Sequence, residues 1–180
     1  QYYQEDTIIG AEEVPEQILY NGFLNLVYTN QGFSAGVRYE SYQNPLLGFP
    51  VGYKGSGFVY RYAGYTNDKL SVTVGNFYEQ FGNGLVLRTY EERGLGYDNA
   101  MDGIRLKYDI YDGITLTGVV GKQRLFFDYG EGILRGFDAE IYLNDAFKSL
   151  SESKTRIIVG GSAVSKFQAD QSDQLVLPEN

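Results

Sequence analysis

Two residue types that carry much of protein chemistry are absent from this chain of 180 residues, which contains neither cysteine nor histidine. The lack of cysteine excludes a disulfide framework and a thiolate metal site. The lack of histidine removes Ser-His and Cys-His nucleophilic pairs together with the usual zinc ligand. The composition therefore predicts a non-enzymatic protein without cofactor or metal. An outer-membrane enzyme whose catalytic residues come from other strands stays an open alternative.

Long apolar runs and an excess of basic charge are lacking as well. No apolar run approaches the ~18 residues of a transmembrane helix. The formal net charge of −8 argues against nucleic acid as a partner, because phosphate binding requires a basic face. The chain is instead rich in Tyr (17), Phe (11) and Gly (23) and has only 4 prolines. This composition favours strands and turns, so an all-β fold is expected.

Residues 103–110 show the most regular alternation of apolar and polar side chains. Successive side chains of a strand point to opposite faces, so this segment predicts a strand with one apolar and one charged face. The apolar face would carry Ile104, Leu106, Tyr108 and Ile110, and the other face Gly103, Arg105, Lys107 and Asp109.

The same alternation recurs in segments of about ten residues, the length that a tilted strand needs to cross a bilayer. The sequence therefore predicts an antiparallel up-and-down transmembrane β-barrel in the bacterial outer membrane, in contact with its lipid. The strands are expected at 22–29, 33–42, 58–66, 70–75, 103–110, 114–123, 135–143 and 156–165.

The connections between these strands alternate in length. Outer-membrane barrels have short periplasmic turns and long outer loops, whereas a soluble sandwich has no reason to sort its connections in this way. The pattern thus favours the barrel over the alternative, a soluble all-β carbohydrate-binding module. Short turns are expected at 30–32, 67–69 and 111–113, and long connections at 43–57, 77–101 and 123–133.

The direction of the strands predicts that the barrel is incomplete. If the short turns are periplasmic, residues 1–3 end an upward strand, and residues 166–180 form an outer loop with no closing strand after it. We therefore expect about eight strands plus a stub. Residues 1–180 would form a single domain, the amino-terminal portion of a larger barrel.

An incomplete barrel leaves two strand edges unpaired, which is costly in lipid. Two explanations are open. The remaining strands are disordered, or an outer-membrane assembly or export complex holds the chain as a substrate or an accessory subunit.

The alternation also assigns individual side chains to the two faces of the barrel. Charges of both signs on the lumen side favour pairing across strands over a selectivity lining, and the tyrosines on the lipid side suit an interfacial aromatic girdle. The expected lumen-facing charged residues are Arg38, Glu40, Arg105, Lys107, Asp138 and Glu140. The expected lipid-facing residues are Leu24, Leu26, Val37, Tyr39, Ile104, Leu106, Tyr108, Ile110, Phe137 and Ile141.

Three loop motifs could carry chemistry, and each has a simpler interpretation. Gly82-Asn83-Gly84 lacks the lysine and hydroxyl residue of a phosphate-binding loop, which favours a turn that folds the loop over or into the barrel mouth. The acidic residues between 91 and 102 could bind Ca²⁺, but they lack EF-hand spacing and fit a solvated loop better. Asp128 and Glu131 could form a glycosidase pair, yet two acids in a glycine-rich loop are usually a turn.

Residues 75–85 (Gly-Asn-Phe-Tyr-Glu-Gln-Phe-Gly-Asn-Gly-Leu), followed by Arg88, Glu91 and Arg93, resemble an uncharacterised family of outer-membrane β-barrel proteins from Bacteroidota, a domain of unknown function. Residues 135–140 and 177–180 also look like that family, so the resemblance covers essentially the whole chain. It implies a cell-surface barrel that continues beyond this segment, and it supplies no catalytic residue.

Overall fold

The computed structural model describes residues 2, 8–10, 17–43 and 49–168 of the chain. The expected stub at residues 1–3 and most of the expected loop at 166–180 lie outside the described residues. Among the described residues the helices are single turns, and no helix has the length and apolar character needed to cross a membrane. They are η1 (Val51–Tyr53), η2 (Arg93–Leu95), α1 (Leu143–Ala146) and η3 (Lys148–Leu150).

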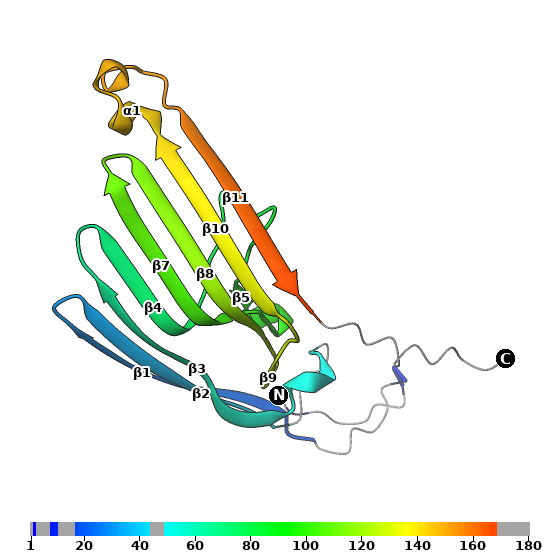
Figure 1. Cartoon of the computed structure of the whole chain (residues 1–180). Coiled ribbons are helices and arrows are strands. Elements are labelled where there is room, and N and C mark those ends of the chain that lie inside the picture. Colours follow the sequence, from blue (N-terminus) through cyan, green and yellow to red (C-terminus); the bar gives the residue numbers. More distant parts are fainter. Residues whose placement is uncertain (1, 3–7, 11–16, 44–48, 169–180) are drawn as a thin grey trace.

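The all-β prediction is confirmed by a nine-stranded antiparallel sheet (Figure 1). Its long strands are β1 (Tyr20–Asn30), β2 (Phe33–Gln43), β3 (Gly55–Thr66), β4 (Leu70–Phe77), β7 (Met101–Tyr111), β8 (Ile114–Leu125), β10 (Ile133–Tyr142) and β11 (Ile158–Phe167). They pair in this order as a meander, and the short β9 (Asp128–Tyr129) pairs with β8. A separate ribbon joins β5 (Glu91–Glu92) to β6 (Tyr97–Asp98).

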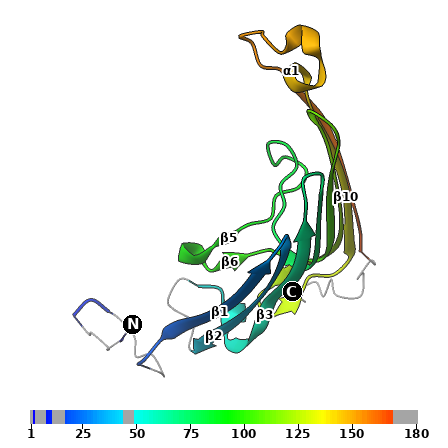
Figure 2. The same ribbon diagram turned by 90° about the vertical axis from the view of Figure 1, so that its left-hand side faces the viewer.

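The sheet is curved but not closed, because its edge strands β1 and β11 do not pair with each other within the described residues (Figures 1 and 2). Every long strand that the alternation predicts is present, with ends that differ by a few residues. The predicted strand at 156–165, for example, is Ile158–Phe167 in the structure.

The short turns and the α1 connection lie at one end of the sheet, and the long connections lie at the other end (Figure 1). The turn between β1 and β2 contains Gln31 and Gly32, both with positive φ (45° and 85°). Two consecutive residues of positive φ give a type I′ turn, whose twist matches that of the strands it joins. The chain therefore reverses in a tight turn at this end of the sheet, whereas the connections at the other end are longer.

A β-bulge explains why residues 58–66 alternate poorly in the sequence. Arg38 pairs with Tyr60 and Tyr39 with Phe58, so Val59 is an extra residue on β3. Such an insertion reverses the face that each later side chain takes. The bulge places Tyr60 on the same face as Arg38, whose guanidinium lies 4.9 Å from the centre of the Tyr60 ring.

The two faces of the sheet differ in what covers them. Residues 78–100, which we call the inner segment, lie over the concave face and include the β5–β6 ribbon (Figure 2). The buried apolar cluster is on this side, where Phe81 and Leu87 of the inner segment pack with strand residues such as Met101 and Val119. The convex face carries exposed apolar side chains with no protein layer over them among the described residues.

The strands β7 and β8 approach closely at a pair of glycines. Gly103 lies opposite Gly121, and a Cβ atom built on Gly103 would overlap the carbonyl oxygen of Val120 and lie 2.6 Å from the Cα of Gly121. Both neighbours are backbone atoms, which cannot rotate away as a side chain can. This contact therefore requires glycine at position 103.

The substitution Gly103→Ala is expected to lower the free energy of unfolding by about 1–3 kcal/mol, the usual cost of overpacking. Gly118 of β8 is a matched control, because a Cβ atom there meets nothing within 4 Å. Denaturant unfolding of both variants under the same conditions measures the difference. Equal stability of Gly103→Ala and Gly118→Ala would contradict the close approach.

Candidate functional site

The inner segment leaves the sheet at the end of β4 and turns back over the concave face through glycines in the left-handed region. Gly75, near the end of β4, and Gly82 and Gly84 of the inner segment have φ values of 96°, 50° and 85°. The amide of Gly84 donates to the carbonyl oxygen of Phe81 (2.8 Å), which closes a tight turn. The glycine-rich run 75–85 therefore serves to fold the loop inward and is not followed by a helix of a phosphate-binding motif.

An apolar contact attaches this turn to the sheet. Phe81 is 2 % exposed and packs with Val119 of β8 and Leu134 of β10. Gly136 of β10 leaves room for the ring, because a Cβ atom there would lie 2.7 Å from Cε2 of Phe81. The turn is thus held against β8 and β10.

A buried ion-pair network attaches the other part of the inner segment. Its members are Arg38 and Glu40 of β2, Glu91 and Asp98 of the inner segment, and Arg124 of β8. Arg38 lies 2.9 Å from Glu91 and 2.8 Å from Asp98. Arg124 lies 2.6 Å from Asp98 and 2.7 Å from Glu40. Each arginine therefore links β2 or β8 to the inner segment.

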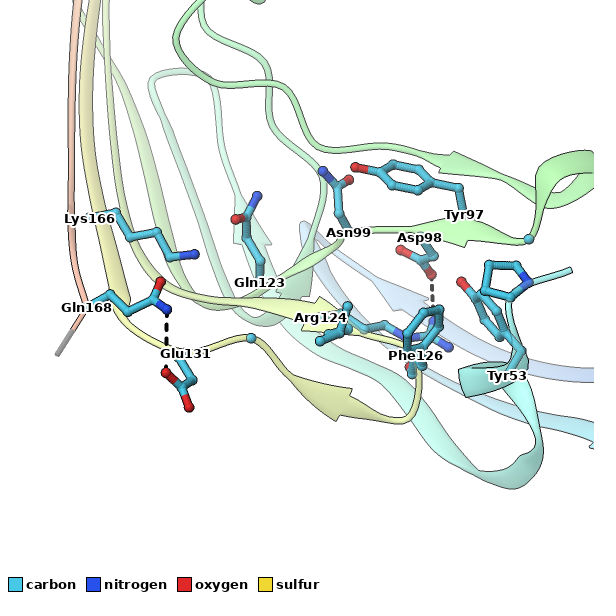
Figure 3. Close-up of a pocket in the computed structure, with 14 residues that line it drawn as sticks. Tyr53, Tyr97, Asp98, Asn99, Gln123, Arg124, Phe126, Glu131, Lys166 and Gln168 are labelled. Carbon is cyan, nitrogen blue, oxygen red and sulfur yellow. Dashed lines mark hydrogen bonds and ion pairs between the residues drawn. The ribbon is translucent and has the colours of Figure 1, made fainter. Parts of the chain in front are cut away.

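The oxygen atoms of Asp98 are fully used within the protein. Oδ2 accepts from both arginines, and Oδ1 accepts from the Tyr78 hydroxyl (3.1 Å) and the Ala100 amide (3.0 Å). Figure 3 shows Asp98 pointing at Arg124 at the side of a cleft of about 540 Å³. A carboxylate that accepts from four donors is held in one orientation. This geometry suits a structural junction and leaves no carboxylate oxygen free for acid–base chemistry.

Glu40, Glu91 and Asp98 place carboxylate oxygens within 4.8 Å of one another, a spacing that would also suit a cation. The two arginines already lie among these oxygens, however, and each carboxylate binds at least one of them. The arrangement is therefore an ion-pair network. The sequence favours a solvated acidic loop for these residues. In the structure, however, Asp98 is buried and Glu91 is half-buried, and both contact arginine.

The remaining acidic and amide side chains between 91 and 102 do not converge on one point. Glu92 accepts from the Gly94 amide and caps η2 (3.1 Å). Asn99 bonds the backbone of Tyr90 and Arg88, and Asp102 pairs with Arg61 (3.2 Å). Each of these groups therefore has a local partner in place of a common ion.

Burial raises the pKa of Tyr78, and its neighbour Asp98 adds to this effect by disfavouring a phenolate. Tyr78 therefore remains a neutral donor to Asp98. Burial would also raise the pKa of the Glu91 carboxyl, but hydrogen bonds from Arg93 and Arg38 outweigh it and hold that pKa below its ordinary value of 4.5. The negative charge of Glu91 is thus stabilised in part by Arg38, and this same ion pair attaches the inner segment to β2.

Acidification is expected to weaken this attachment. The pKa of Glu91 is lower in the folded than in the unfolded chain, so its contribution to stability is present above about pH 4.5 and lost as the pH falls through the lowered pKa. Glu91→Gln should remove this part of the pH dependence, as measured by denaturant unfolding between pH 7 and 3. Glu152→Gln, at an exposed site, should keep it. Parallel profiles for the two variants would contradict the assignment.

The predicted lumen-facing charges lie on the concave side, but only some of them meet. Arg38 and Glu40 pair within β2 at 2.8 Å and join the network. Arg105 lies 3.6 Å from Glu79 of the inner segment and donates to Thr73 (3.1 Å). Asp138, Glu140 and Lys107 take no part in the network.

The three remaining residues have different surroundings. Asp138 accepts a hydrogen bond from Ser162 (2.5 Å), and with Glu140 it lines a groove against Phe81 of the inner segment. Lys107 shares the face of Arg105 by alternation and is exposed. Arg38 and Arg105 therefore have carboxylate partners in the inner segment, whereas the sequence predicts pairing across neighbouring strands.

The predicted lipid-facing residues lie on the convex side. Seven of them are exposed large apolar side chains: Leu24, Leu26, Ile104, Leu106, Tyr108, Ile110 and Phe137. Val37, Tyr39 and Ile141 are half-buried beside neighbouring strands. Tyr39 also contacts Phe58 of β3 with ring centres 5.2 Å apart.

The sequence gives no indication of Arg124 as a network member. Arg124 lies beyond the last pair of the β7–β8 ladder, Met101 with Gln123, and pairs instead with Tyr129 of β9. Its guanidinium also donates to the carbonyl of Phe126 (2.6 Å), across the turn into β9. A lone arginine before a glycine-rich loop is the only sequence signal, and it identifies no partner.

Asp128 and Glu131, the candidate glycosidase pair, have local bonds. Asp128 accepts from the amide of Tyr129 (2.8 Å), and Glu131 accepts from the Gln168 side chain (3.4 Å). Both are exposed, so neither has the enclosed apolar surroundings in which a glycosidase places its general acid. The turn interpretation fits these residues better.

Comparison with known proteins gives a family and no described function. A family model described as "Family of unknown function (DUF6029)" matches residues 1–180, and the chain belongs to that family. No curated protein and no solved structure matches.

Proposed function

We propose that this member of the DUF6029 family forms part of the wall of a β-barrel in the bacterial outer membrane and has no enzymatic activity. The observation that carries the proposal is the contrast between the two faces of the sheet. The convex face exposes large apolar side chains from β1, β7 and β10, whereas the concave face holds charged residues and the inner segment. A transmembrane barrel requires this distribution, with apolar side chains outward.

The lengths of the strands support a membrane-spanning sheet. The long strands contain between 8 and 12 residues each. A tilted strand of 9–11 residues crosses the hydrocarbon core of a bilayer. A soluble sheet has no need for so many neighbouring strands of this common length, because typical strands have about 5–6 residues.

The edge strands support a larger barrel or a partner that supplies further strands. β1 contains no charged residue, and β11 contains only Lys166. Soluble proteins commonly protect an open sheet edge with charges or proline. We propose that the backbone edges of β1 and β11 pair with additional strands. These strands belong to the same barrel or to an outer-membrane assembly or export complex that holds the chain as substrate or accessory subunit.

The proposal is tested by the need for detergent. We expect the chain to fold only in detergent or lipid, with a β-rich far-UV spectrum and a gel mobility that changes on heating. In water the apolar side chains of the convex face would stay exposed, and an exposed apolar patch of this extent drives association. A soluble, folded monomer in plain buffer would contradict the proposal and favour the soluble carbohydrate-binding module.

A further inference from the structure

We infer that the inner segment is a fixed constriction of the barrel lumen, attached to the wall by the ion-pair network and by Phe81. This inference rests on the proposed barrel, since it concerns what fills its interior. It differs from the usual behaviour of long outer loops, which extend away from the barrel. In Figure 2 the β5–β6 ribbon instead projects over the hollow side of the sheet.

The inner segment has two separate attachments, so it cannot swing about a single point. Its first part is held by Phe81 and Leu87, which are 2 % and 3 % exposed. Its second part is held by Asp98 and Glu91, which bind arginines of β2 and β8. Both ends are continuous with strands of the sheet, β4 and β7.

The charges on the two sides of this junction complement each other. Arg38 and Arg124 of the wall face Glu91 and Asp98 of the inner segment, while Glu40 of the wall bridges the two arginines. If the segment moved away, two arginines would be left with one carboxylate. The same movement would expose Met101 and Val119, which are buried beneath it. Electrostatic attraction and apolar burial therefore act in the same direction.

The backbone of the inner segment is also bonded internally. The amide of Phe81 donates to Leu87 (3.1 Å), that of Thr89 to Glu79 (2.9 Å), and that of Asn99 to Tyr90 (3.3 Å). These bonds join its two branches into one unit. Such amides exchange slowly with solvent only while the unit stays closed.

Amide hydrogen exchange of the detergent-folded chain tests the attachment. We expect amides of the inner segment to exchange as slowly as those of β7. Asp98→Asn removes the charge that both arginines share, so exchange in the inner segment should accelerate about 10- to 100-fold while β7 and β8 stay protected. Asp145→Asn, in an exposed pair 3.5 Å from Arg156, is the matched control and should change nothing in the inner segment. Fast exchange there in the unmodified chain would overturn the inference.

Permeability tests the constriction itself. Cells that produce the unmodified protein should gain no sensitivity to a large hydrophilic antibiotic, whereas cells with Asp98→Asn should gain it. Sensitivity with the unmodified protein, or none with a variant whose inner segment exchanges quickly, would overturn the inference. If the proposed outer-membrane barrel is wrong, the result is different, because the chain then folds without detergent.

Discussion

Arg124→Met is expected to lower the free energy of unfolding by about 3–5 kcal/mol, the usual cost of removing one partner from a buried ion pair. The guanidinium of Arg124 is almost fully buried and lies 2.7 Å from Glu40 and 2.6 Å from Asp98. Methionine fills a similar volume but leaves two carboxylates facing each other with only Arg38 between them. Denaturant unfolding in detergent micelles measures the loss.

The matched control is Arg156→Met. Arg156 is 65 % exposed and pairs at 3.5 Å with Asp145, which is also exposed. Exposed pairs of this kind contribute about 0–1 kcal/mol. The double variant Glu40→Gln/Arg124→Met should regain part of the stability lost in Arg124→Met, because it removes one of the uncompensated charges. A loss for Arg124→Met as small as that for Arg156→Met would show that the network does not hold the inner segment.

Phe81→Ala is expected to have a similar effect, with a loss of about 3–5 kcal/mol. The ring is 2 % exposed and packs between β8 and β10, where Gly136 leaves space for it. Alanine would leave a cavity on the concave face that the backbone of two paired strands cannot close. The same unfolding measurement applies.

Leu85→Ala is the matched control for Phe81→Ala, since Leu85 lies four residues away on the same turn and is 87 % exposed. It should change stability by less than about 0.5 kcal/mol. If both substitutions cost the same, the turn does not pack on the sheet as the structure shows.

The strands could be predicted because their faces have different surroundings. In β7 every second residue from Ile104 to Ile110 is apolar, and the strand extends this segment by two residues at one end and one at the other. Alternation fails where the backbone departs from a regular ladder. The bulge opposite Arg38 disturbs the alternation in β3, and no local residue preference in 58–66 indicates that a bulge forms there.

The ion-pair network could be predicted only in part, because its partners are distant in the sequence. Alternation places Arg38 and Glu40 on the lumen side. It does not show that Arg38 meets a residue 53 positions away, or that Glu40 meets one 84 positions away. The first of these contacts depends on the inward path of residues 78–100, whereas the second joins β2 to β8, which are not neighbours in the sheet. The inward path results from tertiary packing of Phe81, which a glycine-rich turn permits but does not specify.

The central claim is that the convex face of the sheet contacts lipid and the concave face does not. The chain contains no tryptophan, so a single introduced tryptophan reports on its own position. We would place one at Ile104, Arg105, Leu106, Lys107 or Tyr108 and measure fluorescence in bilayers of lipids with brominated acyl chains. The account predicts strong quenching at 104, 106 and 108 and weak quenching at 105 and 107. Equal quenching at all five positions, or none, would contradict it.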